Sequence, residues 1–247
     1  MAQGKIFVGI GGWTYAPWRG GVFYPKDLSQ KRELEYASRQ LTSIEINGTY
    51  YSSFKPETWA KWRDETPDGF VFSVKASRFT TNRRNLAEAG ESVERFLGQG
   101  LHELGDKLGP ISWQFMATKK FDAEEMGAFL KLLPKTIKSC PLRHALEVRS
   151  PTFKDPKFYD LARKHRVAIV LADHDEFPEI DEPTANFSYA RLMRSQAKVK
   201  TGYKPGALDT WAKRAKASAK AGDSFVYVIA GAKERAPAAA RALIERL

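Results

Sequence analysis

The sequence contains a single cysteine, Cys140, among its 247 residues. One cysteine excludes an internal disulfide framework and is typical of proteins from a reducing compartment. No apolar run approaches the roughly 18 residues that a membrane-spanning helix needs. The first residues show neither a long apolar segment nor a small-residue cleavage site. We therefore expect a cytoplasmic protein with no signal peptide and no membrane partner.

Internal repeats, low-complexity stretches and linkers are also missing, so nothing divides the chain. Residues 1–247 are predicted as one domain, because barrels of alternating strands and helices commonly contain roughly 250 residues. A hydrophobic fraction of 43% is enough for a sizeable core. The sequence carries no signal for an oligomeric state.

The net charge of +11 is unevenly distributed. Residues 191–247 hold 13 Lys and Arg against 4 Asp and Glu, whereas residues 167–190 hold six acids and no Lys or Arg. Such asymmetry indicates either a phosphorylated or polyanionic partner or a solvated basic flank. Both interpretations remain open at this point.

Short apolar runs alternate with helical patterns along the chain, which predicts parallel strands joined by right-handed crossovers. The eight predicted strands are 6–10, 43–46, 70–74, 111–115, 145–148, 168–171, 187–192 and 225–229. Asp122 and Glu125 form a capping-box pattern before one helix, and Pro205 opens another. Residues 174–185 are predicted as an irregular connection between strands six and seven. We predict an α/β fold, a single TIM-like (β/α) barrel, with an open doubly wound sheet as the alternative.

One face of several predicted strands is polar. Side chains alternate between the two faces of a strand, and the face that packs against outer helices should be apolar. The opposite, inward face carries Glu45 and Asn47, Lys75, Gln114, and Glu147 with Arg149. Its charged members come at the carboxyl ends of the strands, where barrel enzymes build their active sites. A purely structural network, in which Lys75 and Arg149 neutralise the two glutamates, is the alternative.

The loops that follow the strands add aromatic and basic side chains to the same end. The predicted contributors are Trp13, Tyr15, Tyr51, Arg191 and Tyr203. Aromatic walls beside guanidinium groups suit a ligand with a flat or sugar-like body and an anionic end.

These segments resemble the domain of unknown function 72 family, the YecE-like proteins. The resemblance begins at GIGGWTYAPWRGGVFYP (9–25) and continues in order through SIEINGTYY, PDGFVFSVKAS, KLGPISWQF and LEVRSPTF. It covers nearly the whole chain and implies a TIM-barrel fold without a settled activity. The positions that it implies are family-typical are Trp13, Tyr15, Glu45, Asn47, Lys75, Gln114, Glu147, Arg149, Asp173 and Arg191.

The chain departs from the family pattern at three places. Asn82 follows Thr81 where the family has Thr-His. Residues 191–194 read RLMR instead of Arg-Leu-His-Gly, and residues 229–231 read IAG instead of Phe-Asn-Asn. Two potential imidazole bases and two amides are therefore absent, which implies that a histidine-dependent step of relatives is lost or altered here.

No cofactor is predicted. The GIGG motif at 9–12 lacks the third glycine of a dinucleotide fingerprint, and Pro17 interrupts the expected helix, so these glycines are interpreted as close backbone packing. Asp173, His174 and Asp175, together with Glu147, offer oxygen and nitrogen ligands for a divalent metal as a less favoured alternative.

The favoured hypothesis is an enzyme that acts on a small anionic substrate, a phosphorylated sugar or nucleotide-like compound. Glu45 and Glu147 are predicted as an acid/base pair, and Asp173 completes the predicted catalytic carboxylates. Lys75 is predicted to stabilise negative charge or to form a Schiff base. Arg149 and Arg191 are predicted to hold the anionic group.

Two other hypotheses remain. A nucleic-acid-binding protein or nuclease would use the basic C-terminal third, with Arg194, Lys198, Lys200 and Lys204 along the mouth. A catalytically degenerate barrel that acts as a binding module would account for the departures from the family pattern.

Overall fold

The computed structural model describes residues 3–247, so the first two residues of the predicted domain lie outside it. A parallel sheet forms its centre, with strand order β8-β7-β4-β3-β2-β1-β11-β10-β9. Its strands are β1 (Ile6–Gly11), β2 (Ser43–Ile46), β3 (Val71–Lys75), β4 (Leu108–Gln114), β7 (His144–Glu147), β8 (Ala168–Ile169), β9 (Leu171–Asp173), β10 (Phe187–Leu192) and β11 (Asp223–Val228). All neighbouring strands in this sheet pair in parallel.

The sheet curves into a nearly closed barrel, because the two strands at the ends of its order are parts of one segment. Only Val170 separates β8 from β9, and its N–H donates to the Leu146 carbonyl on β7 at 2.9 Å. The predicted sixth strand therefore pairs with β7 through its first half and with β10 through its second half. The predicted TIM-like barrel is confirmed, and the open-sheet alternative is wrong.

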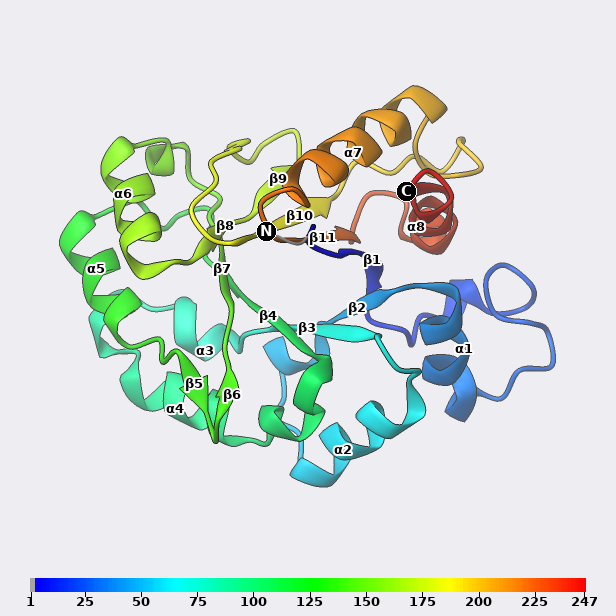
Figure 1. Cartoon of the computed structure of the whole chain (residues 1–247), viewed down its shortest axis with the longest axis horizontal. Helices are drawn as coiled ribbons and strands as arrows, with labels where there is room; N and C mark the ends of the chain where they lie inside the picture. Colours follow the sequence, from blue (N-terminus) through cyan, green and yellow to red (C-terminus); the bar gives the residue numbers. More distant parts are fainter. Residues whose placement is uncertain (1–2) are drawn as a thin grey trace.

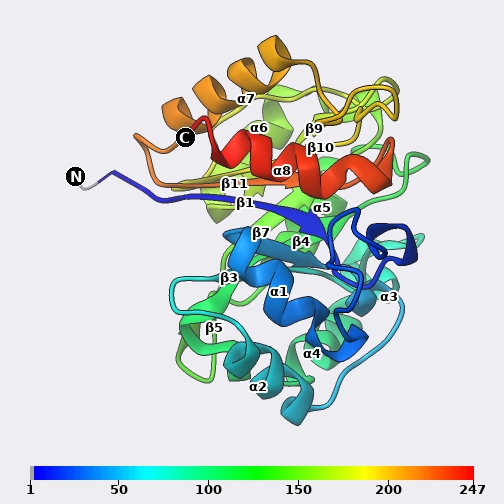
Figure 2. The same cartoon turned by 90° about the vertical axis from the view of Figure 1, so that its right-hand side faces the viewer.

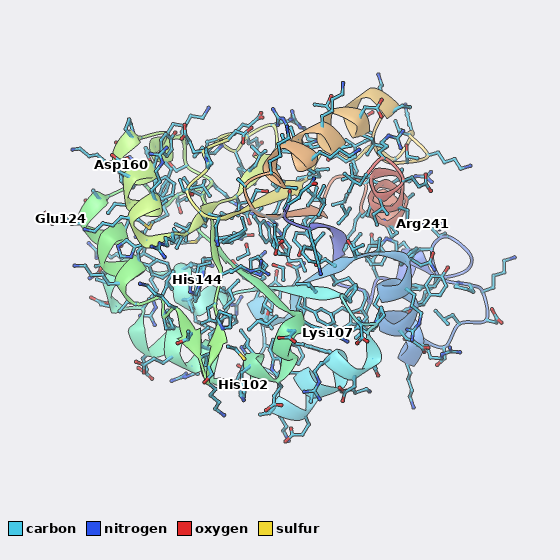
Figure 3. All side chains as sticks on the ribbon, viewed as in Figure 1. His102, Lys107, Glu124, His144, Asp160 and Arg241 are labelled. Atoms are coloured by element: carbon cyan, nitrogen blue, oxygen red, sulfur yellow. The ribbon has the colours of Figure 1, made fainter. Side chains whose placement is uncertain are left out.

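Helices surround the barrel (Figure 1). They are α1 (Glu33–Gln40), α2 (Pro56–Glu65), α3 (Arg78–Thr81), α4 (Gly90–Gly98), α5 (Ala123–Lys131), α6 (Pro156–His165), α7 (Pro205–Ser218) and α8 (Ala236–Ile244). Short 3₁₀ helices span Ala16–Trp18, Gln30–Arg32, Gly48–Tyr50, Leu86–Glu88, Leu101–Lys107, Pro151–Phe153 and Lys233–Arg235. Glu124, Asp160 and Arg241 mark three of the outer helices in Figure 3.

Local signals in the sequence explain where helices begin. The Asp122 carboxylate accepts a hydrogen bond from the Glu125 N–H at 2.8 Å, so the predicted cap of α5 is confirmed.

Between β9 and β10 the chain forms no helix, in agreement with the predicted irregular connection. Within residues 3–247, no helix combines the length and the apolar character required to cross a membrane.

The interior of the barrel is packed at the end where the strands begin. The Phe7 and Phe225 rings stack at 4.9 Å, and the Tyr189 and Tyr227 rings lie 5.1 Å apart above them. Phe7 lies on β1, and Phe225 and Tyr227 lie on β11. Figure 2 shows these two strands running side by side. These aromatic rings fill the barrel interior near the beginnings of the strands, and the charged side chains inside the barrel lie nearer the carboxyl ends of the strands.

Gly9 allows β1 and β2 to approach each other closely. A Cβ atom at this position would lie 2.0 Å from the backbone carbonyl oxygen of Ser43, a distance that no side chain tolerates. The interpretation of the GIGG glycines as close backbone packing is therefore confirmed at Gly9.

A small hairpin, β5 (Thr136–Ile137) and β6 (Cys140–Pro141), precedes β7 and was not predicted. Its two-residue turn holds Lys138 and Ser139 at φ values of 42° and 68°. Turns of this kind favour glycine or asparagine, so the sequence carries no signal for it.

Candidate functional site

A buried arginine joins two buried glutamates across the barrel. Arg191 on β10 is 2% exposed, and both Glu45 on β2 and Glu147 on β7 are fully buried. Its Nη2 donates to Glu45 Oε1 at 2.9 Å, and its Nη1 pairs with Glu147 Oε2. None of these three strands is adjacent to another in the sheet, so the ion pairs span the barrel interior.

A second arginine covers this group on the side of the mouth. Arg149 donates from Nε and Nη2 to Glu147 Oε1 at 2.9 and 2.8 Å. Its Nη2 also donates to Gln114 Oε1 at 2.7 Å, and its guanidinium lies 4.5 Å from the centre of the Phe177 ring. The Arg149 side chain is 23% exposed, so this cation reaches solvent while its carboxylate partner does not.

Tyr189 occupies the remaining oxygen of Glu45. Its hydroxyl donates to Glu45 Oε2 at 2.5 Å and lies 2.7 Å from Ser73 Oγ. Burial and the Glu45 carboxylate raise the pKa of Tyr189 well above its ordinary value. The sequence prediction missed Tyr189, although it lies two residues before Arg191 and therefore shares its inward face.

All four carboxylate oxygens of the two glutamates thus have partners. Burial alone would raise the pKa of Glu147, but three neighbouring cations outweigh it and hold that pKa below its ordinary value. Those cations are Arg191, Arg149 and Lys75. A carboxylate held in this way is a weak proton acceptor.

Lys75, the last residue of β3, differs from the other charged members of the group. It is partly exposed, and its Nζ lies 4.4 Å above the centre of the Tyr50 ring. Among residues 3–247 it forms no ion pair with a carboxylate. Burial, and next the Arg191 guanidinium, lower the pKa of Lys75 to about 8.

The structure therefore brings together six of the predicted site residues: Glu45, Lys75, Gln114, Glu147, Arg149 and Arg191. In the structural-network alternative Lys75 was expected to neutralise a glutamate. That pairing is wrong, because Arg191 takes this place, whereas the other pairing of the same alternative, Arg149 with Glu147, is present.

Asp173 belongs to a separate group. Its Oδ2 accepts from the Tyr203 hydroxyl at 2.7 Å, and its Oδ1 accepts from Arg194 Nε at 2.6 Å. Arg194 also bonds Asp175 at 3.2 Å. Arg194 stands at one of the departures from the family pattern, and there it fixes the segment that follows β10 to the end of β9.

Two of the predicted aromatic residues pack against other aromatic rings. Trp13 packs edge-on against Trp62 of α2 at 5.2 Å and is not brought to the ion-pair group. Tyr15 packs against Trp18 at 5.2 Å, and Lys233 Nζ lies 4.5 Å above its ring.

Two further predicted residues follow β2. Asn47 donates from Nδ2 to the backbone carbonyl of Glu45 at 3.3 Å, so its side chain lies at the carboxyl end of β2. Tyr51 is 68% exposed, and its ring stands 5.8 Å from the Arg78 guanidinium.

The alternative metal ligands are not assembled. Across residues 3–247 no three His, Cys, Asp or Glu side chains are arranged to hold a metal ion. The His174 ring stacks on Phe177 at 3.8 Å, and its Nδ1 accepts from the Glu176 N–H at 3.1 Å. Glu147 is engaged by arginines, so it does not join Asp173 as a ligand.

Structural comparison finds the same fold in other solved proteins. A DUF72 family protein from Thermotoga maritima MSB8 is 21% identical, with a TM-score of 0.76 over 97% of both chains. A D-psicose 3-epimerase from Clostridium cellulolyticum H10, solved with D-tagatose, is 13% identical, with a TM-score of 0.56 over 98% of both chains. Both likenesses show a shared fold.

Sequence comparison gives the same result as the motifs. The UPF0759 protein YecE of Escherichia coli (strain K12) is 29% identical over 152 residues, which cover 60% of this chain and 50% of that protein. The chain thus spans about half the length of this curated relative. Residues 7–247 match the family described as Protein of unknown function DUF72. The chain therefore belongs to the DUF72 family.

Proposed function

We propose that this chain is an enzyme acting on a small anionic substrate, a phosphorylated sugar or nucleotide-like compound, at the carboxyl end of the barrel. One observation carries this proposal. The buried carboxylates Glu45 and Glu147 are paired, whereas Lys75 and Arg149, the group's solvent-reaching charges, are cations. A ligand that enters from the mouth meets positive charge first.

Arg149 has the geometry to hold the anionic end of such a ligand. Its Nε and Nη2 are engaged, and Nη1 has no hydrogen bond among the described residues. Guanidinium groups bind carboxylate and phosphate strongly. Gln114 and Phe177 fix the plane of the guanidinium, which reduces the entropy lost on binding.

The D-psicose 3-epimerase shares only the fold with this chain. The substrate class is therefore inferred from the side chains alone. Carbohydrate-sized ligands commonly bind at the carboxyl face of such barrels.

Replacing Arg149 with methionine is expected to weaken binding of ribose 5-phosphate by at least about tenfold, because a charge-assisted pair of this kind contributes about 1.5–3 kcal/mol. Isothermal titration calorimetry measures the change, with uncharged ribose as the comparison ligand. Lys213→Met, an exposed residue of α7, is the matched control and should leave the affinity unchanged.

Conversion of phosphorylated aldoses and ketoses, followed by NMR, tests the enzymatic part. Conversion that disappears in Arg149→Met supports the proposal. Equal binding by the wild type, Arg149→Met and Lys213→Met would overturn the anion site. Binding without any conversion would favour the binding-module alternative.

A second candidate function is nucleic-acid binding, and it is favoured by a basic hollow at the opposite end of the barrel. A hollow of about 960 Å³ lies beside the beginnings of β4, β7, β8 and β10. Its exposed cations are Lys131, Lys135, Lys164 and Arg166. None of these four forms an ion pair among residues 3–247.

Burial, and then Lys164, Lys131 and Lys135, lower the pKa of His165, so these three amines are close enough to repel added positive charge. Arg194, which was assigned to nucleic acid in the sequence-based alternative, is instead paired with Asp173.

Affinity for a fluorescein-labelled 20-nucleotide DNA, measured by anisotropy, is expected to fall steeply between 50 and 200 mM salt, because phosphate contacts release counterions. A triple variant with Lys131, Lys135 and Lys164 changed to glutamine should flatten this dependence. The matched control changes Lys198, Lys200 and Lys204 to glutamine and should leave it intact. A reversed pattern would place binding at the mouth, and no binding at 50 mM salt would remove this candidate.

A further inference from the structure

Lys75 has the features of a reactive amine. It ends β3 at the mouth of the barrel, and its Nζ lies over the Tyr50 ring instead of against a carboxylate. Glu45 and Glu147 are near enough to influence its ionisation, yet other partners occupy all their oxygens. An amine that only balanced charge would be expected to share one of those oxygens.

The surroundings also favour the neutral form of the amine. Burial, and next the Arg191 guanidinium, lower the pKa of Lys75 to about 8 against the opposing effect of Glu45 and Glu147. Roughly a quarter of the lysine is then neutral at pH 7.5, compared with about 0.1% for an ordinary lysine. The neutral amine is the form that attacks carbonyl carbon.

The residue that pairs with Lys75 on the neighbouring strand carries a hydroxyl without a partner among the described residues. Ser112 pairs with Lys75 in the β3–β4 register, and it shares the inward face of β4 with Gln114. Its Oγ is fully buried and has no hydrogen-bond partner among the described residues. Buried polar atoms rarely lack a partner, so this hydroxyl can form a hydrogen bond with a ligand group bound at Lys75.

We propose that Lys75 is the nucleophile of this site and forms an imine with the carbonyl group of an anionic aldehyde or ketone. This inference rests on the proposed function, because Arg149 holds the anionic group of the same substrate. The Ser112 hydroxyl, on the residue paired with Lys75, would bond the oxygen or nitrogen of the carbinolamine.

The step balances without a further reactant. The neutral Nζ adds to the carbonyl carbon, which forms a C–N bond, and one amine proton passes to the carbonyl oxygen. Loss of that oxygen as water breaks the C–O bond and removes the second amine proton, leaving the imine. Nothing is oxidised or reduced, and the imine becomes cationic by taking a proton from solvent.

Borohydride trapping tests this proposal. The full chain is incubated with D-glyceraldehyde 3-phosphate and reduced with sodium borohydride, which converts an imine into a stable secondary amine. Peptide mass spectrometry is expected to find Lys75 labelled at least about tenfold more than the exposed lysines at pH 7.5, given the difference in neutral fraction from an ordinary lysine. The labelling rate at Lys75 should rise with pH around a midpoint of about 8.

Lys233 provides the matched control, because it is also a partly buried lysine whose Nζ lies 4.5 Å above an aromatic ring, that of Tyr15. Lys75→Arg should remove the dominant label, and Lys233→Arg should keep it. Labelling spread evenly over the lysines, or unchanged total labelling in Lys75→Arg, would overturn the proposal.

Glycerol 3-phosphate separates the two levels of inference, because it carries the anion but no carbonyl group. Binding of glycerol 3-phosphate that depends on Arg149, without any trapped imine, would refute the imine and leave the anion site standing. Absence of both binding and trapping would refute the imine together with the proposed function.

Discussion

Replacing Arg191 with methionine is expected to lower the free energy of unfolding by about 3–5 kcal/mol. The guanidinium is 2% exposed and pairs with two fully buried carboxylates. Arg149 still neutralises Glu147 in this variant, but Glu45 keeps only the Tyr189 hydroxyl as a partner. Urea denaturation at pH 7 measures the loss.

Two further variants show whether unpaired charge is the cause. Arg149→Met removes a partly exposed partner and should cost only about 1 kcal/mol. Changing Glu45 and Glu147 to glutamine together with Arg191→Met removes every charge of the buried set and should recover most of the lost stability. If Arg191→Met costs no more than Arg149→Met, the ion pairs across the barrel do not stabilise the fold as described.

Lowering the pH from 7 to 5 is expected to remove about 2 kcal/mol of stability through His144 alone. Burial lowers the pKa of this histidine to about 4, against an ordinary value of 6.5. Between pH 6.5 and pH 4 this histidine is protonated in the unfolded chain but not in the folded chain. The free energy of unfolding therefore falls as the pH falls. The loss begins near pH 6.5 and is complete below about pH 4.

The hydrogen bonds of His144, which is labelled in Figure 3, explain the effect. Its Nδ1 accepts from Trp113 Nε1 at 3.1 Å, and its Nε2 lies 2.8 Å from the Pro134 carbonyl, to which it donates. Protonation of His144 would place a proton on Nδ1, and the resulting N–H would face the Trp113 N–H, so this hydrogen bond would be lost. His144→Gln retains one acceptor and one donor without titrating, so its stability should change by about 2 kcal/mol less than that of the wild type over the same pH range. Parallel stability curves for the two proteins would contradict this account.

The fold was largely predictable because strand periodicity and helix caps are local signals. The strands at Ser43–Ile46 and Phe187–Leu192 have the predicted boundaries. The break at Val170 was not predictable, because it arises where one segment changes its hydrogen-bonding partner from β7 to β10. That change depends on curvature of the whole barrel.

The inward set at the mouth was predictable from alternation alone, since Glu45, Lys75 and Glu147 each share a face with another polar residue. The ion pairs that these side chains form could not be predicted from the sequence. Which cation reaches which carboxylate depends on distances across the barrel, and these follow from strand tilt. Arg191, which was predicted to hold the anionic group of a substrate, therefore pairs with both glutamates, and Lys75 forms no ion pair among residues 3–247.

The ion pairs across the barrel also constrain the order in which the chain becomes a folded protein. Glu45 and Glu147 belong to the first three-fifths of the sequence, but Arg191 follows much later. Before β10 is in place, the Glu45 carboxylate would be buried in the barrel without its arginine partner. The free energy of burying an unpaired charge is too large for a partial barrel to offset. Neither half of the barrel is therefore expected to fold by itself. The molecule should fold and unfold as one cooperative unit, because the last quarter of the sequence supplies the buried arginine.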